Sequence, residues 1–418
     1  MNLIKTSFLT LIATVIRLIS GLVINKAISV FIGPSGLALI GQFQNSLTVV
    51  QTIAKGGINT GVTKYTAEYK EEKDRKVLWS TAFSITLLSS MTVSFFLFIF
   101  SKKMSEYIFS TENYSYVISV LAFTLILFTI NQLFLSILNG KKEIKKYISI
   151  NISQSLYGLF STTLLIYFFA LDGALVALVT NQSIVFVMMI YKYKKANLIN
   201  RDILRINFSK LYTNKLLKYS LMTLVTAFTI PVSSLIIRNH IGENLSWDEA
   251  GYWQAITYIS TMYLMVITTA LSTYYLPRLS ELNSSRELKL ELIQGYKFII
   301  PLVVCLSVII FILKDFIVWL LFSEEFKPML VLFKWQLVGD VLKIASWLLS
   351  YLLVAKAMMK HYIISEIFFA LSLTVLSMIF VEKFGLVGVT YAYAINYVIY
   401  YFMMLIIVKT TIFSKKET

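Results

Sequence analysis

The chain has 418 residues, of which 57% are hydrophobic and only 14% are charged, and its mean hydropathy is +0.73. A soluble protein of this length cannot bury so much apolar surface, so the composition excludes a soluble enzyme and predicts an all-α integral membrane protein. The net charge of +16 does not indicate nucleic-acid binding, because the basic residues lie mostly in short segments between apolar runs.

Apolar runs of spanning length follow one another along the chain. The first contains Arg17 and Lys26 and is too long for a signal-peptide core, so it is interpreted as a span and not as a cleaved leader. The connections between runs are short, and the longest joins the sixth and seventh spans. The twelve predicted spans cover residues 7–31, 36–63, 77–100, 115–138, 147–169, 172–191, 216–238, 250–276, 296–320, 329–352, 361–381 and 386–408.

Loop charge predicts the orientation. With both termini inside, the inner segments carry 27 Lys and Arg and the outer segments carry 6, which predicts cytoplasmic termini. The single cysteine, Cys305, excludes an intrachain disulfide. His240 and His361 fall near opposite membrane faces, so no metal site is expected.

The two halves of the chain resemble each other. LIKTSFLTLIAT (residues 3–14) aligns with LLKYSLMTLVTA (216–227), and GQFQ (41–44) aligns with GYWQ (251–254) at nearly the same offset. This repeat predicts an N-terminal lobe at 1–191, a cytoplasmic linker at 192–215 and a C-terminal lobe at 216–418. Two six-helix lobes in the same orientation would enclose a central cleft, as in transporters that rock around their substrate.

Polar residues recur along the second predicted span. Gln44, Thr48, Gln51, Lys55 and Asn59 fall within a narrow wedge of one helix face. Short polar residues can simply bind neighbouring helices to one another. A stripe that includes a lysine favours the other interpretation, in which it forms one wall of a polar passage.

Other charged residues lie within the predicted spans. Arg17 lies near mid-span, whereas Lys26 lies near the outer end and can equally extend to the interface. Asp340 and Lys343 lie one turn apart on the tenth span, either as a pair that makes membrane insertion tolerable or as a coupling site in which Asp340 changes protonation. Because Lys334 adds a further cation, the spans carry more positive than negative charge, and such a cleft favours an anion such as phosphate.

Several chemistries are missing from the sequence. There is no phosphate-binding G-x-x-x-x-G-K-[ST] loop, no HExxH motif and no nucleophile constellation, so we expect a transporter with no catalytic residues. Asn244 and Ser246 precede Trp247, Asp248 and Glu249, a pattern that predicts an N-cap and an acidic first turn for the eighth span.

Five stretches carry a family resemblance: NKAISVFIGPSGLALIGQFQN, GGINTGVTKYTAEY, SWDEAGYWQAITYIS, YYLPRLSEL and WQLVGDVLK. They resemble the Wzx-type flippases, especially the lipid III (enterobacterial common antigen) and O-antigen translocases. These belong to the multidrug/oligosaccharidyl-lipid/polysaccharide (MOP) exporter superfamily, which also contains the MATE transporters. The resemblance implies twelve spans in two lobes around a cationic cavity. It also implies movement of undecaprenyl-diphosphate-linked oligosaccharides from the inner to the outer leaflet of the bacterial inner membrane.

The resemblance directs attention to the polar residues already identified. Asp340 is the candidate coupling residue for a proton or sodium ion, and no other cofactor is expected. A glycan polymerase or chain-length regulator is the implied protein partner. Alternatives are a MATE-like drug or cation exporter, a polyprenol-glycan polymerase or ligase, and a scaffold that transports nothing. The candidate substrate-binding residues are Arg17, Lys26, Gln44, Gln51, Lys55, Asn59, Lys64, Gln254 and Lys343.

Overall fold

The computed structural model describes residues 3–195, 205–282, 284–356 and 358–413, and these residues form helices joined by short turns, with no β-strand among them. The predicted all-α class is confirmed for this part of the chain. Residues 196–204 of the predicted linker lie outside the described residues. Contacts divide the chain into two compact units: unit 1 is Met1–Ile32 with Leu39–Pro231, and unit 2 is Gly33–Ala38 with Val232–Thr418.

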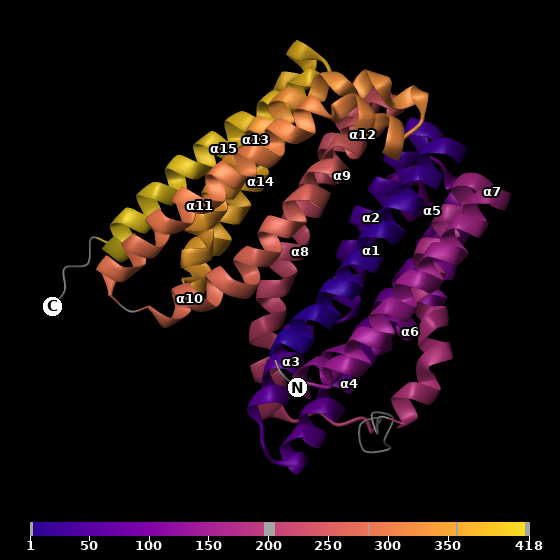
Figure 1. The fold of residues 1–418 in the computed structure, drawn as a ribbon. Helices are drawn as coiled ribbons and strands as arrows, with labels where there is room; N and C mark the ends of the chain where they lie inside the picture. Colours follow the sequence, from indigo (N-terminus) through magenta and orange to yellow (C-terminus); the bar gives the residue numbers. More distant parts are fainter. Residues whose placement is uncertain (1–2, 196–204, 283, 357, 414–418) are drawn as a thin grey trace. The chain divides into compact units, whose positions relative to one another are not determined.

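Unit 1 is built from the helices of the first half of the chain, coloured indigo to magenta (Figure 1). Its core centres on Leu78, Phe134 and Tyr193, which are almost fully buried where α4, α6 and α7 meet. The first part of α8 and the part of α2 from Leu39 onward belong to this unit, and the remainder of each helix belongs to unit 2. The helices are α1 (Leu3–Phe31), α2 (Gly33–Ala54), α3 (Asn59–Glu68), α4 (Glu72–Ile99), α5 (Ser101–Phe109), α6 (Ser115–Gly140), α7 (Ile144–Lys195) and α8 (Lys210–Asn244).

Unit 2 contains the helices of the second half, in which α13 and α15 pack along each other and α14 packs on α15. Ile344, Leu348 and Tyr400 lie in its core. The helices are α9 (Trp247–Ala270), α10 (Leu276–Glu281), α11 (Ser285–Ile312), α12 (Lys314–Leu321), α13 (Phe333–Ala355), α14 (Met359–Phe384) and α15 (Val387–Val408).

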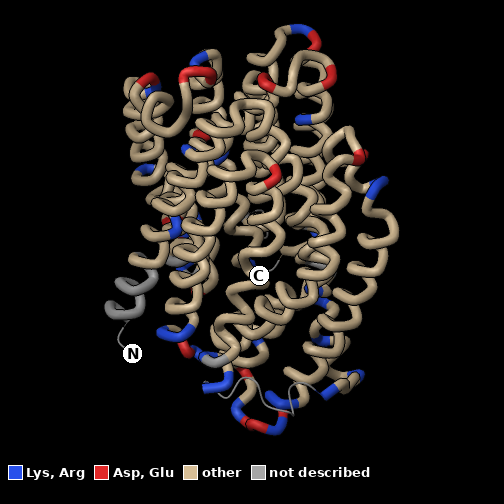
Figure 2. The backbone as a smooth tube through the Cα atoms, turned by 90° about the vertical axis from the view of Figure 1, so that its right-hand side faces the viewer, with Lys and Arg blue, Asp and Glu red and all other residues tan. Residues whose placement is uncertain are grey.

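Among the described helices, nine are long and apolar enough to cross a membrane: α1, α4, α6, α7, α8, α11, α13, α14 and α15. Their outward faces carry large apolar side chains such as Phe160, which is 72% exposed, as expected of surfaces that contact lipid. Most Lys, Arg, Asp and Glu residues lie near the ends of the helices, and the middle parts of the helices carry few of them (Figure 2). Two predicted spans, 147–169 and 172–191, are the two arms of α7, which meet at the non-helical Ala170.

The second predicted span is not one helix. α2 ends at Ala54, and Gly56 and Gly57 follow with φ angles of +66° and +64° before α3 begins. L-residues with a side chain rarely adopt this left-handed region, so two consecutive glycines break the helix. A Cβ on Gly57 would also lie 3.0 Å from the backbone oxygen of Ser220 on α8. The predicted continuous stripe is therefore wrong beyond Lys55, because the glycine turn redirects the chain.

The start of α9 follows the predicted capping pattern. Ser246 is the N-cap, and its hydroxyl accepts a hydrogen bond from the backbone N–H of Glu249 at 3.1 Å. Asp248 accepts a hydrogen bond from the backbone N–H of Ser35, in the first turn of α2, at 3.0 Å. One carboxylate of the acidic first turn of α9 thus binds the N-terminus of a second helix in unit 2.

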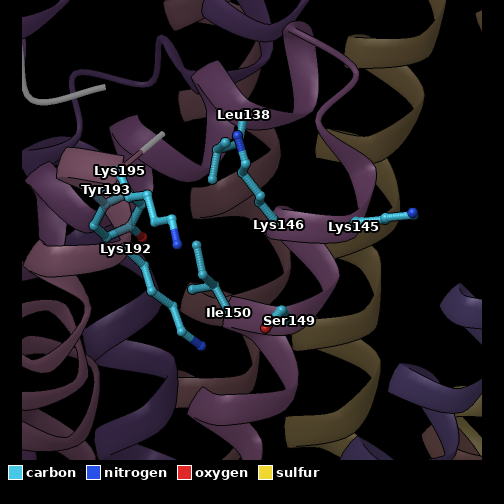
Figure 3. Close-up of a pocket in the computed structure, with 8 residues that line it drawn as sticks. All are labelled: Leu138, Lys145, Lys146, Ser149, Ile150, Lys192, Tyr193 and Lys195. Atoms are coloured by element: carbon cyan, nitrogen blue, oxygen red, sulfur yellow. The ribbon is translucent and has the colours of Figure 1, made fainter. Parts of the chain in front are cut away.

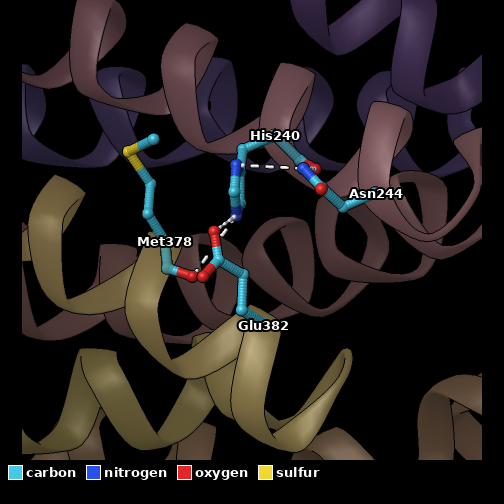
Figure 4. Close-up of polar contacts among 4 residues, drawn as sticks. All are labelled: His240, Asn244, Met378 and Glu382. Atoms are coloured by element: carbon cyan, nitrogen blue, oxygen red, sulfur yellow. Dashed lines mark hydrogen bonds and ion pairs between the residues drawn. The ribbon is translucent and has the colours of Figure 1, made fainter.

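His240 connects α8 to α14 in the same unit (Figure 4). Its Nε2 lies 3.7 Å from a carboxylate oxygen of Glu382 and 3.3 Å from the carbonyl oxygen of Met378. The amide of Asn244 lies 3.1 Å from Nδ1 of the same ring. This histidine therefore has polar partners on two helices.

Candidate functional site

A polar cavity of about 350 Å³ lies inside unit 1, between the middle of α1, the end of α6 and the first turns of α7. It forms because α1 packs along α7. Its lining residues are Ala13, Thr14, Arg17, Asn139, Ile144, Tyr147, Ile148, Asn151 and Ser155.

Arg17 is the charged residue within this described lining, and its side chain is exposed. Its neighbours on α7 are polar but neutral, and two of them bond back to their own helix: Asn151 donates to the carbonyl of Tyr147 at 2.9 Å, and Ser155 to that of Asn151 at 3.0 Å. The guanidinium of an arginine presents a planar set of donors that matches the oxygens of a phosphate. The cavity can therefore accept an anionic group.

The other predicted residues of unit 1 lie outside the lining of this cavity. Gln44 is exposed on α2, and Gln51 is partly buried two turns later. Lys55, at the end of α2, is partly buried with its ammonium 5.9 Å from the centre of the Phe128 ring. A cation over an aromatic face is stabilised there, so Lys55 has a structural reason for its position.

The glycine turn moves two more predicted residues onto α3. Asn59 is partly buried in the first turn of α3, and Lys64 is exposed with its ammonium 5.3 Å from the Tyr65 ring. Lys26 is partly buried on α1, and its backbone carbonyl accepts a hydrogen bond from Ser29. Arg17 is thus the predicted residue of unit 1 that the structure associates with the cavity.

Unit 2 contains a buried carboxylate surrounded by hydroxyl groups. Asp340, on α13, is 0% exposed. Ser260 and Tyr393 donate to its Oδ1 at 2.5 and 2.9 Å, and Tyr263 donates to its Oδ2 at 2.8 Å. These donors come from α9 and α15, so the carboxylate holds three helices together. A buried carboxylate is tolerated where its oxygens accept hydrogen bonds, as both oxygens of Asp340 do.

The sequence around Asp340 explains how the donors reach it. Gly339 precedes it, and a Cβ at that position would lie 2.3 Å from the Tyr393 ring. The missing side chain therefore lets Tyr393 approach α13. Gln336, one turn earlier, lies 3.5 Å from Oδ1 through its amide nitrogen, as its predicted place on the same face requires.

Lys343 follows Asp340 by one turn on α13 and interacts electrostatically with its carboxylate. Its ammonium lies 5.0 Å from the centre of the Trp347 ring, one further turn along α13. Asp340 and Lys343 therefore share a face of α13, as predicted. The donors of the hydrogen bonds to Asp340 described above are hydroxyl and amide groups.

A row of tyrosines on α15 lies between Asp340 and a second, partly buried carboxyl group. The ring of Tyr393 lies 4.9 Å from that of Tyr397, and the ring of Tyr397 lies 6.3 Å from that of Tyr400. The hydroxyl of Tyr400 donates to Glu366 of α14 at 2.8 Å. Phenol groups therefore link the middle of unit 2 to the start of α14.

Arg238 is a buried cation that the sequence reasoning missed. It is 3% exposed on α8, donates to the side-chain oxygen of Gln254, and lies 5.5 Å from the centre of the Trp253 ring. The predicted seventh span ends at residue 238, which places this arginine at the border of the outer loop and not inside the membrane. α8 runs on to Asn244, which places it more than a turn inside the helix. The cap at Ser246 was the available signal, because it marks the start of the next helix and leaves room for α8 to continue past residue 238.

Comparison with known proteins gives the family of the chain. Residues 3–283 match the family model described as polysaccharide biosynthesis protein. The lipid III flippases of Escherichia coli (strain K12) and Shigella flexneri are each 31% identical to the chain over 403 residues, which is 96% of this chain and 97% of each relative.

Solved structures support the same fold at low sequence identity. An inward-facing MATE-family multidrug transporter of the MOP superfamily aligns with a TM-score of 0.78 at 14% identity, covering 96% of both chains. The lipid II flippase MurJ aligns with a TM-score of 0.74 at 14% identity, covering 97% of this chain and 87% of that one. The fold is therefore that of the MOP transporters, and with the full-length sequence match, the chain belongs to the polysaccharide biosynthesis protein family that includes the lipid III flippases.

Proposed function

We propose that this protein is a flippase that moves a polyprenyl-diphosphate-linked oligosaccharide across the bilayer. The observation that carries the proposal is the 31% identity to lipid III flippases along 96% of the chain. The cavity around Arg17 adds a physical reason, because a diphosphate crosses hydrocarbon only when its charge is compensated. The polyprenyl tail needs no such compensation and stays in lipid throughout.

In this proposal Arg17 binds the diphosphate. Lys26, Lys55, Lys64 and Lys343 supply further positive charge along the path, while Gln44, Gln51, Asn59 and Gln254 hydrogen-bond to the glycan. The lipid carrier is undecaprenol, and the membrane is the bacterial inner membrane with both termini in the cytoplasm. Twelve spans cross it, with α2 and α9 completing the set. A glycan polymerase or chain-length regulator then receives the translocated unit.

Asp340 is the proposed coupling residue. Its carboxylate accepts hydrogen bonds from three hydroxyl groups, so an arriving proton or sodium ion would displace donors on α9 and α15. Tyr393 and Tyr400 of α15 donate hydrogen bonds to the carboxyl groups of Asp340 and Glu366, so one helix contacts both carboxyl groups. No other cofactor enters the proposal.

A cellular experiment tests the function. In a strain whose own flippase is deleted, the wild-type gene should restore surface glycan and prevent accumulation of lipid-linked oligosaccharide in the inner leaflet. Arg17→Ala should fail at equal expression, whereas Lys334→Ala should complement fully, because Lys334 is exposed in the first turn of α13. Drug resistance conferred on an efflux-deficient host, without glycan rescue, would overturn the proposal in favour of a drug exporter.

A further inference from the structure

A second cavity lies in unit 1, at the end that the loop charges predict to be cytoplasmic. It has a volume of about 400 Å³ and lies between the end of α6 and both ends of α7 (Figure 3). The lining residues are Leu138, Lys145, Lys146, Ser149, Ile150, Lys192, Tyr193 and Lys195.

This cavity is distinct from the one that contains Arg17. The first turns of α7 present Ile144, Tyr147 and Ile148 to the Arg17 cavity, and they present Lys145, Lys146, Ser149 and Ile150 to the second. The two sets lie on different faces of the same helical segment, as the 3.6-residue period requires. No residue belongs to both described linings.

The rim of the second cavity is strongly basic. Lys192 and Lys195 extend from the end of α7 on one side, and Lys146 extends from its start on the other, while Lys145 points away from these three (Figure 3). Glu143 lies 3.3 Å from Lys146, but both side chains are more than 40% exposed, so this ion pair is weak. The rim therefore keeps positive charge that is available to an anion.

The floor of the cavity is apolar and rigid. Leu138, Ile150 and Tyr193 are at most 2% exposed. The Tyr193 hydroxyl donates to Asn131 at 2.7 Å, and its ring lies 5.2 Å from that of Phe134. A fixed apolar floor beneath a basic rim, at the end of a membrane helix pair, suits a ligand with an anionic head and an apolar body.

Membrane topology alone does not explain this arrangement. Basic residues at the cytoplasmic ends of spans set orientation, and they also interact favourably with a helix C-terminus. Lys194 meets both requirements in the same turn of α7, yet it does not line the cavity. Topology therefore accounts for a group of lysines at this end of α7, and it leaves unexplained the cavity that Lys192 and Lys195 line.

We propose that this second cavity binds the phosphate group of an anionic phospholipid from the adjacent leaflet, at a site separate from the path of the transported substrate. Lys146, Lys192 and Lys195 contact the phosphate oxygens, Ser149 donates a hydrogen bond, and the apolar floor contacts the glycerol and the first methylenes of the acyl chains. The site does not depend on the proposed transport function.

The test is native mass spectrometry of the detergent-purified full-length protein, titrated with phosphatidylglycerol. Lys192→Ala/Lys195→Ala should weaken binding roughly tenfold or more, because direct charge-assisted contacts to phosphate are lost. The matched control Lys142→Ala/Lys194→Ala removes two exposed lysines near the same end of unit 1, neither of which lines the cavity, and binding should stay within about twofold, since exposed charges that do not touch the ligand are screened. Arg17→Ala should bind as tightly as wild type.

Three results would overturn the proposal. Equal loss in the two double variants would indicate general attraction to a basic surface. Phosphatidylcholine binding as tightly as phosphatidylglycerol would exclude recognition of the anionic head, and inorganic phosphate binding as tightly as the lipid would indicate a site for a free anion. If thermal denaturation shows that the alanine variant does not fold, Lys192→Gln/Lys195→Gln replaces it, because glutamine keeps part of the apolar stem of lysine. Unchanged lipid binding in a folded double variant contradicts the proposal directly.

Discussion

The hydroxyl of Tyr263 on α9 donates a 2.8 Å hydrogen bond to the buried carboxylate of Asp340 on α13. Tyr393 of α15 donates to the other oxygen of the same carboxylate. A group held from two further helices can change their packing when its charge changes, because the donors that suit an ionised carboxylate do not all suit a protonated one. This relationship is the reason for assigning the coupling role to Asp340.

Asp340→Asn should keep the protein folded and abolish the dependence of transport on an ion gradient. The amide has the shape of the carboxylate and can still accept hydrogen bonds, but it can neither bind a proton at neutral pH nor neutralise a sodium ion. The measurement is flipping in proteoliposomes with and without an imposed proton or sodium gradient. A variant that still responds to either gradient as wild type does would remove Asp340 from the coupling mechanism.

Tyr393→Phe should lower the free energy of unfolding by about 1.5–3 kcal/mol, the contribution of a buried hydrogen bond to a charged group. In Asp340→Asn the same substitution should cost less, because a neutral acceptor forms a weaker bond. Thermal denaturation of the four proteins in detergent gives this double-mutant cycle. Strictly additive losses would mean that the phenol and the carboxyl group do not interact energetically.

Arg238→Ala should be among the more destabilising substitutions in unit 2. It removes a charged donor to Gln254 and a cation from the face of Trp253, and buried hydrogen bonds to charged groups contribute about 1.5–3 kcal/mol. Arg238→Lys should lie between alanine and wild type, since it keeps the charge but loses the planar donor set. Denaturation midpoints measure both, with Lys334→Ala as the matched surface control, and equal midpoints for Arg238→Ala and the control would refute the assignment.

Gly57→Ala should destabilise unit 1 by more than about 1 kcal/mol, because the residue has a positive φ and its Cβ would press on the backbone of Ser220. Gly158→Ala is the control: its Cβ would meet its nearest described neighbour, an Asn181 side-chain nitrogen, at an ordinary 3.8 Å. That substitution should be neutral or slightly stabilising, since alanine favours the helix. Comparable losses at the two positions would argue against the turn as the cause.

The sequence predicted the helical class and the face of α13 that carries Asp340, because both follow from local periodicity and hydropathy. The prediction of a continuous polar stripe along the second span was wrong because Gly56 and Gly57 end the helix. A hydropathy window averages over two adjacent glycines and does not show the turn. The position of the turn also depends on the close approach of Gly57 to Ser220, which is 163 residues away in the chain. Arg238 was missed for a related reason. When the end of a span is predicted from its last apolar residues, a buried charge at that end is taken for a loop residue.

The sequence did not predict which residues of other helices contact the candidate site residues. Nothing local to Asp340 indicates that Tyr263 and Tyr393 donate to it, and nothing local to Lys192 indicates that it lies across a cavity from Lys146. Arg17 was selected for its depth in the first span, but its neighbours Asn139 and Asn151 become visible only when α1 packs on α7. Periodicity assigns a residue to a face, and tertiary packing decides what that face meets.

The central claim is that Arg17 compensates the charge of a diphosphate head during translocation, and flipping of a fluorescent polyprenyl-diphosphate oligosaccharide in proteoliposomes measures this most directly. Wild-type protein should accelerate flipping, Arg17→Ala should reduce the rate at least roughly tenfold, corresponding to one lost charge-assisted contact, and Arg17→Lys should recover part of it. Wild-type rates in a correctly folded and incorporated Arg17→Ala variant would contradict the account.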